Sequence, residues 1–265
     1  MQIELRTLRN TSTLRHGCSL PVRPDSLERA WKKLDSVISE VAARYEEELA
    51  PAIDRVWKDS IAVIRTDLRE WLRRASEDDS GYVPWRFELS FGLEGRSDRQ
   101  HTDPESVPGA ATLDCGIQLR GSIDLVERLP GVGLRVTDHK TGKVSGKQGQ
   151  MTDGGKSLQP LLYALAAEKR FSRQTIHSGR LYFCTSIGGF SEQVVLLDEE
   201  SRNLIDEIVE AVRDSLAKPF LPAAPEKGQC EFCDYRVVCG PNEERRTARK
   251  RQVDLQALLA VRSLP

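Results

Sequence analysis

The chain of 265 residues lacks any run of 18 uncharged apolar residues, so we expect no membrane-spanning helix. Its first 18 residues, MQIELRTLRNTSTLRHGC, lack the apolar segment of a secretory signal, and we expect a cytoplasmic protein. Six cysteines are too few for a disulfide scaffold and should stay reduced in that compartment. With 39 Lys and Arg against 40 Asp and Glu, the chain has almost no net charge. Any site for a polyanion such as nucleic acid must therefore be local.

The apolar pattern predicts an α/β fold. Apolar residues spaced by three and four predict helices, which cover residues 26–49, 51–74, 158–170 and 199–217. Alternation of apolar and polar residues predicts strands, which cover 85–91, 113–119 with 123–125, 134–140, 181–185 and 193–197. The last two strands, joined through Gly188 and Gly189, have the form of a β-hairpin. The order of these elements indicates a small mixed sheet flanked by helices.

We expect one compact domain made of three segments. Residues 1–75 hold an N-terminal segment and two long helices, 76–218 form the core, and 219–265 form a cysteine-rich tail with a basic C-terminal run. The basic run could contact DNA or a partner, although a solvated helical tail is the more ordinary interpretation.

Acidic residues and one lysine stand on the predicted strands. Glu88 and Asp124 each alternate with apolar neighbours, and Asp138 and Lys140 are two residues apart, so they project from the same side of a strand. A charged pair at the end of a buried face is costly unless a metal or substrate compensates it. Three carboxylates together would form an oxygen cage suited to Mg²⁺ or Mn²⁺ beside phosphate. Taken singly, each of these residues is more often structural than catalytic.

The combined motifs resemble a known family. The series GSID (121–124), DHKTGK (138–143) and Gln159-x-x-x-Tyr163 is similar to the PD-(D/E)XK nuclease superfamily, and within it to the RecB/AddB-type nuclease domains of bacterial recombination helicases. The resemblance implies a restriction-endonuclease-like core. It also implies metal-dependent hydrolysis of DNA phosphodiesters, exonuclease-like, on single strands or duplex ends, beside a helicase subunit or domain in repair and recombination. The setting would be the bacterial cytoplasm, in association with the nucleoid.

The resemblance also assigns roles to residues. Glu88, Asp124 and Asp138 would hold Mg²⁺ or Mn²⁺ with the backbone carbonyl of His139, and Lys140 would position or activate the attacking water. The remaining candidates are active-site or DNA contacts, namely Gln159, Tyr163, Lys143, Lys147 and Lys156. For Tyr163 a place at the edge of the core explains the pattern equally well, and for the lysines a solvated loop would look the same.

One departure from the family concerns histidine. Domains of this type usually begin with a helix bearing Gly-x-x-x-His, whose His joins the metal site, but neither predicted N-terminal helix contains a His. His16 lies in a segment that does not fit the motif. A second hypothesis is therefore a catalytically silent DNA-binding or structural module of a helicase–nuclease complex.

Three cysteines in the tail have the spacing of metal ligands. Cys230, Cys233 and Cys239 form C-x2-C-x5-C, which can converge on one metal. The resemblance implies a [4Fe–4S] cluster with one distant upstream cysteine, for which Cys18 is the candidate; zinc is the alternative. A zinc-knuckle adaptor would explain this tail but not the DHKTGK series. Cys115 and Cys184 alternate with apolar residues and should be buried core thiols.

Overall fold

The computed structural model describes residues 22–93, 103–144, 150–217, 223–240 and 242–265. The chain forms two compact units: the first contains residues up to Gly149 together with Gln159–Asp198, and the second contains Gln150–Leu158 and Glu199–Pro265. No helix within the described ranges is long and apolar enough to cross a membrane.

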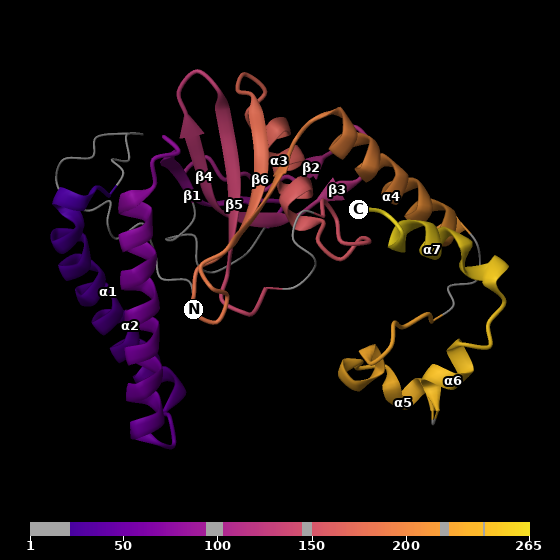
Figure 1. The fold of residues 1–265 in the computed structure, drawn as a ribbon, viewed down its shortest axis with the longest axis horizontal. Coiled ribbons are helices and arrows are strands. Elements are labelled where there is room, and N and C mark those ends of the chain that lie inside the picture. The colour runs from indigo at the N-terminus through magenta and orange to yellow at the C-terminus, as the bar shows by residue number, and fades with distance from the viewer. Residues whose placement is uncertain (1–21, 94–102, 145–149, 218–222, 241) are drawn as a thin grey trace. The chain divides into compact units, whose positions relative to one another are not determined.

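The first unit is built on a five-stranded mixed sheet (Figure 1). Its strands lie in the order β1-β4-β5-β6-β7, and every neighbouring pair is antiparallel except β5 and β6. The strand bounds are β1 Val83–Phe91, β4 Gly121–Leu129, β5 Gly133–Lys140, β6 Ile176–Phe183 and β7 Glu192–Leu196. The parallel pair needs a crossover connection, which contains helix α3 (Gln159–Arg170). The expected small mixed sheet flanked by helices is therefore confirmed.

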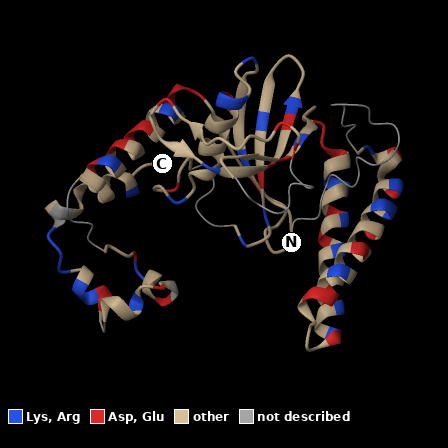
Figure 2. Cartoon of the chain, turned by 180° about the vertical axis from the view of Figure 1, so that it is seen from behind, with Lys and Arg blue, Asp and Glu red and all other residues tan. Residues whose placement is uncertain are grey.

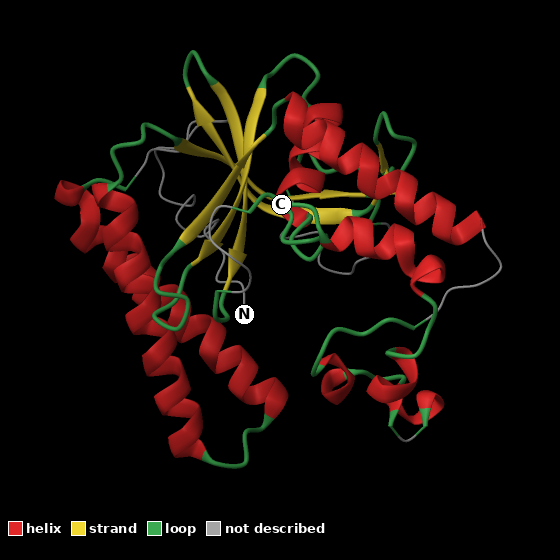
Figure 3. Cartoon of the chain, turned by 45° about the vertical axis from the view of Figure 1, so that its right-hand side comes forward, coloured by secondary structure: helices red, strands yellow, loops and turns green. Residues whose placement is uncertain are grey.

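Two long helices form an antiparallel pair beside the sheet (Figures 1 and 3). They are α1 (Leu27–Leu49) and α2 (Asp54–Glu77), close to the predicted bounds. Their apolar stripes meet in a buried cluster that also takes in Cys184, and its buried helical members are Ala30, Leu34, Ile38, Ile61, Trp71 and Leu72. Charges of both signs cover the outer surface of the pair (Figure 2), as an amphipathic helix requires.

One predicted strand was partly wrong. Residues 113–117 do not form a strand but the turn between the two-residue strands β2 (Ala111–Thr112) and β3 (Gln118–Leu119). The amide of Leu113 donates to the carbonyl of Ile117 at 2.9 Å, which closes the turn. Cys115 is consequently half-buried rather than in the core, whereas Cys184 is buried as expected. Alternation over so few residues cannot distinguish a strand from a hairpin turn.

The second unit contains α4 (Glu199–Ala217), the cysteine tail and the C-terminal helix. Helix α4 has the predicted bounds, and α7 (Gln256–Arg262) packs on it. The amide and hydroxyl of Thr152 both donate to the carbonyl of Pro265, at 2.8 and 2.7 Å, which attaches residues 150–158 to the end of the chain. Short helices make up the rest of the tail, namely η4 Gln229–Phe232, α5 Arg236–Cys239, α6 Glu243–Thr247 and η5 Gln252–Leu255.

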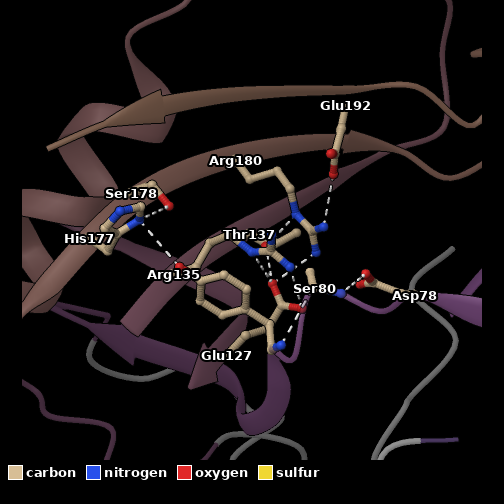
Figure 4. Close-up of polar contacts among 10 residues, drawn as sticks. Asp78, Ser80, Glu127, Arg135, Thr137, His177, Ser178, Arg180 and Glu192 are labelled. Carbon is tan, nitrogen blue, oxygen red and sulfur yellow. Dashed lines mark hydrogen bonds and ion pairs between the residues drawn. The ribbon is translucent and has the colours of Figure 1, made fainter. Parts of the chain in front are cut away.

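A buried charged cluster joins four strands of the sheet (Figure 4). The carboxylate of Glu127 on β4 accepts hydrogen bonds from Arg135 and Thr137 on β5 and from Arg180 on β6, at 2.7 to 3.1 Å. Arg180 also pairs with Glu192 on β7 at 3.0 Å. Burial favours a higher pKa for Glu127, but the charges of Arg180 and Arg135 outweigh it and lower that pKa. Because each polar group has a partner on a neighbouring strand, this Glu127 cluster fixes the register beside Asp138.

Helix α3 sits on the sheet at Gly179 of β6. A Cβ built on Gly179 would lie 2.1 Å from the carbonyl oxygen of Pro160, closer than any real contact. Gly179→Ala should therefore push α3 off the sheet and lower the free energy of unfolding by about 1–3 kcal/mol, measured by urea denaturation. Gly109→Ala is the matched control, because a Cβ at Gly109 would meet nothing within 4 Å. Equal stability of the two variants would contradict this close packing.

The Glu127 cluster predicts a pH-dependent stability. Because the folded-state pKa of Glu127 is lowered, its stabilisation is fully present above its unfolded pKa of about 4.3 and is lost as the pH falls through the lower folded value. Glu127→Gln leaves two arginines without their carboxylate, so at pH 7 it should cost about 3–5 kcal/mol in urea unfolding. The difference from the wild type should shrink only in acid, below roughly pH 4.

Glu192→Gln is the control for this experiment. The side chain of Glu192 is 50% exposed and also pairs with Arg180, so its removal should cost no more than about 1 kcal/mol. A Glu127→Gln penalty as small as that of Glu192→Gln would refute the structural role of the cluster.

Candidate active site

Asp138 and Lys140 end a buried face of β5. Leu134 and Val136 share this face and are 0% and 1% exposed, and Asp138 is 7% exposed. The side-chain ammonium of Lys140 lies 2.6 Å from Oδ2 of Asp138. The expected projection of both groups from one side of the strand is therefore accompanied by a direct ion pair, which compensates part of the buried charge.

Gln159 completes this pair as the first residue of α3. Its Nε2 donates to Oδ1 of Asp138 at 2.6 Å, and its Oε1 accepts from Nζ of Lys140 at 2.7 Å. The amide therefore complements both charges at once, with its donor toward the anion and its acceptor toward the cation. Asp138, Lys140 and Gln159 form a closed triangle of contacts, which we call the catalytic triangle after the role that the family resemblance predicts for these residues. Because α3 packs closely on Gly179, its first residue, Gln159, lies within hydrogen-bond distance of Asp138 and Lys140.

Asp124 lies on the neighbouring strand β4, next to this triangle. Leu125 pairs with Thr137, so the antiparallel register brings Asp124 opposite Asp138. Oδ2 of Asp124 accepts a hydrogen bond from the backbone amide of His139 at 2.7 Å. Burial raises the pKa of Asp138, the hydrogen bond from Lys140 opposes that rise, and the negative charge of Asp124 adds to it. Two carboxylates from neighbouring strands thus lie close together, and one of them is paired with Lys140.

Glu88 has an unusual backbone conformation on β1. The pairs Phe87–Leu125 and Leu89–Ile123 place Glu88 across from Asp124, but its φ of 51° lies in the left-handed region. Such a residue interrupts the alternation of the strand, so parity no longer sets the direction of its side chain. Strain of this kind costs on the order of 1–3 kcal/mol and tends to cluster at functional sites.

The metal cage expected from the sequence is present only in part. Among the residues that the structure describes, no three His, Cys, Asp or Glu side chains are grouped so that they could hold a metal ion. Asp124 and Asp138 supply adjacent oxygen donors, the kind that Mg²⁺ and Mn²⁺ prefer. The donor chemistry fits a divalent ion, while the roles of Glu88 and of the His139 carbonyl as further ligands stay predictions.

Tyr163 is held by packing contacts. Its ring meets Phe91 edge to face, with centroids 6.0 Å apart, and its hydroxyl would lie 3.0 Å from a Cβ on Gly121. Gly121 thus makes room for Tyr163 at the start of β4, three residues before Asp124. These contacts agree with the core-edge interpretation, and a role of Tyr163 in catalysis stays a prediction.

Helix α2 contributes two residues that the sequence analysis missed. The ring of Trp71 meets His139 edge to face with centroids 5.8 Å apart. Asp67 is 7% exposed, and its Oδ1 accepts a hydrogen bond from the amide of Ser186, in the loop after β6, at 3.1 Å. The signal was available, because Asp67 stands three residues after Ile64 and four before Trp71, on the apolar stripe of the helix.

The three loop lysines have different settings. Lys143 is exposed in the first unit, shortly after Lys140. Lys156 belongs to the second unit, where its ammonium pairs with Glu226 at 2.7 Å. Lys147 lies outside the described residues. Contacts of these lysines with DNA stay predictions.

The three tail cysteines lie in one short segment. Cys230 is buried, Cys239 is half-buried and Cys233 is exposed. Burial, followed by nearby negative charges that include the thiolates of Cys233 and Cys239, raises the pKa of Cys230. The thiols are thus close enough to influence one another, yet no group of three in the described residues has the arrangement of metal ligands. Cys18 lies outside the described residues, so the structure does not test it as a fourth ligand.

The candidate site thus consists of an acid pair, a lysine and a helix-borne glutamine at the strand ends of a mixed sheet. The chain belongs to the PD-(D/E)XK nuclease superfamily, whose family model matches residues 12–240. That match covers the sheet and the catalytic triangle as well as the cysteine segment.

Two curated proteins show partial similarity. The Gene 69 protein of Mycobacterium phage D29 is 29% identical over 126 residues, which are 47% of this chain and 43% of the phage protein. An ATP-dependent helicase/deoxyribonuclease subunit of Symbiobacterium thermophilum is 30% identical over 145 residues, or 52% of this chain and 12% of the Symbiobacterium protein. The chain therefore matches less than half of the length of either relative.

Proposed function

We propose that this chain is a Mg²⁺- or Mn²⁺-dependent deoxyribonuclease domain that hydrolyses DNA phosphodiesters, in the manner of an exonuclease. The observation that carries the proposal is the catalytic triangle with Asp124 beside it. The Symbiobacterium relative is named as a helicase/deoxyribonuclease subunit, which supports a helicase as the partner in DNA repair and recombination.

The residues divide the chemical work between them. Asp124 and Asp138 offer the oxygen atoms that would hold the divalent ion, with Glu88 as a further candidate. When bound, such an ion lowers the pKa of water and polarises the phosphoryl group. Lys140 places a positive charge where negative charge builds up on the phosphate oxygens. Gln159 holds the ammonium of Lys140 and the carboxylate of Asp138 in fixed relative positions, so less reorganisation is needed during the reaction.

Substitutions in the catalytic triangle test the proposal. Asp138→Asn and Lys140→Met should each reduce cleavage of end-labelled DNA with Mg²⁺ or Mn²⁺ by roughly 100-fold or more, the usual loss for one transition-state contact. Asp114→Asn and Lys58→Met are matched controls with exposed side chains in surface ion pairs, and both should cleave like the wild type. Cleavage that survives both triangle substitutions would place the active site elsewhere.

A second candidate function is a catalytically silent DNA-binding or structural module. It is favoured by the lack of any three-residue metal group in the described part of the chain and by the lack of His in α1 and α2. Calorimetric titration with Mn²⁺ separates the two proposals. A nuclease should bind Mn²⁺, and Asp124→Asn should abolish that binding, whereas a silent site should give no heat that depends on Asp124.

For the tail we propose a [4Fe–4S] cluster held by Cys230, Cys233, Cys239 and Cys18. The donor set supports a thiolate-bound metal, because three thiols fall within one short segment of the tail. Ligand geometry commonly forms only with the metal, because metal binding and folding of such segments are coupled. Zinc would use the same thiolates, so the experiment has to separate the two metals.

Protein purified without oxygen should be brown and contain iron and sulfide. Cys233→Ser should bleach it and make the tail more sensitive to protease, because a cluster ligand and its cross-link are lost. Cys115→Ser is the control, since that thiol lies outside the tail. A colourless anaerobic preparation with stoichiometric zinc would refute the cluster, and unchanged colour in Cys18→Ser would exclude Cys18 as a ligand.

A further inference from the structure

Three arginines surround two aromatic rings at the other end of α3. The guanidinium of Arg86 on β1 lies 4.4 Å from the ring centre of Trp85, and that of Arg128 on β4 lies 5.2 Å from it. Phe171, just after α3, meets Trp85 with ring centres 5.0 Å apart, and Arg170 lies over Phe171. We call Arg86, Arg128 and Arg170 the arginine cluster. Cation–π contacts hold the guanidinium groups without neutralising them.

A bulge in β1 creates this arrangement. The pairing of β1 with β4 shifts between Pro84 and Arg86, which leaves Trp85 as the extra residue. An extra residue changes the direction of the side chains around it. Here it places Trp85 next to Arg128, whose own pairing partner on β1 is Val83.

Within the described residues, Glu105 is the acid that pairs with the arginine cluster. Glu105 binds Arg170 through its carboxylate and lies 3.8 Å from Arg86. Asp103, two residues before Glu105, accepts hydrogen bonds from the backbone amides of Glu105 and Phe87. Nε of Arg86 is buried and has no hydrogen-bond acceptor among the described residues. A buried donor without an acceptor is costly, and an anion would satisfy it.

The arginine cluster lies on the same face of the sheet as the catalytic triangle. Arg86 pairs with Val126, and Asp124, Val126 and Arg128 alternate along β4, so all of them share one face. Helix α3 begins at Gln159 and ends at Arg170, so it spans about 16 Å between the two sites. That distance corresponds to roughly five nucleotides of one strand of B-DNA.

We propose that the arginine cluster binds a phosphate of the substrate strand, roughly five nucleotides from the bond that is cleaved. The inference rests on the proposed nuclease function for the identity of the ligand. The arginine cluster would be a second contact with the strand, in addition to the catalytic triangle, and the distance between the two would set the length of DNA that the domain binds. Guanidinium groups suit this role because they bind phosphate oxygens in pairs.

Inorganic phosphate tests the anion site without any nuclease activity. Titrated at low ionic strength, phosphate should change the tryptophan fluorescence of the wild type in a saturable way, and Trp85→Phe should lose that response. Arg128→Gln should weaken binding about tenfold or more, while Arg128→Lys should retain part of it. Arg55→Gln is the control, because Arg55 is 92% exposed on α2. A wild type that ignores phosphate, or a folded Arg128→Gln that binds it normally, would overturn the site.

DNA of two lengths then identifies the ligand. With EDTA present, the wild type should bind a 12-nucleotide strand more tightly than a 3-nucleotide strand. Arg128→Gln should remove most of this difference and reduce the salt slope of the longer strand by about one. Phosphate binding without this length dependence would mean that the site takes a free anion, which refutes the assignment to DNA. If the wild type cleaves DNA and Arg128→Gln changes neither measurement, the inference fails while the nuclease stands. If Arg128 governs phosphate binding but the wild type cleaves no DNA, the anion site stands and the nuclease fails.

Discussion

The carboxylate of Asp138 is buried at the end of β5, and its charge has to be compensated for this edge of the sheet to be stable. Lys140 supplies the opposite charge, and Gln159 satisfies one hydrogen-bonding group on each. Because Gln159 belongs to α3, the compensation succeeds only if α3 lies close to the sheet, and Gly179 permits that approach. The position of an entire helix is thus tied to the solvation of one carboxylate.

Polar residues on the same three strands divide into two groups with different tasks. The Glu127 cluster is internally neutralised and fully hydrogen-bonded, so it stabilises the register of β4, β5 and β6. Asp124 and Asp138, in contrast, are two carboxylates next to each other, and burial together with the negative charge of Asp124 raises the pKa of Asp138. The first group makes the sheet rigid, and the second keeps two carboxylates close together on neighbouring strands. A rigid, fully hydrogen-bonded cluster next to two mutually repelling carboxylates is a common arrangement at catalytic sites.

Much of the fold was predictable because its elements carry long apolar patterns. The bounds of α1, α4, β5 and α3 agree with the sequence pattern to within about one residue, and the motifs alone group Asp138, Lys140 and Gln159 correctly. The turn at residues 113–117 was mistaken for a strand because an alternation of apolar and polar residues over so short a segment cannot distinguish a strand from a turn. The direction of Glu88 was not accessible, because a left-handed backbone at a glutamate leaves no sequence signature. Asp67 could have been found as an acid on the apolar stripe of α2, but its contact with Ser186 and the arginine cluster depend on tertiary contacts among distant segments, which periodicity does not report.

Lys140 and Gln159 are joined by a hydrogen bond although they stand 19 positions apart in the chain. Of the residues between them, 150–158 belong to the second unit, whereas α3, which follows directly, belongs to the first. The catalytic triangle is therefore the closing contact of a loop whose far part is ordered by other residues, including the bonds from Thr152 to Pro265. Closing a loop costs less entropy when part of it is already fixed. A contact between residues this far apart also restrains the chain between them, so the triangle carries the entropic cost of closing that loop in addition to compensating its own charges.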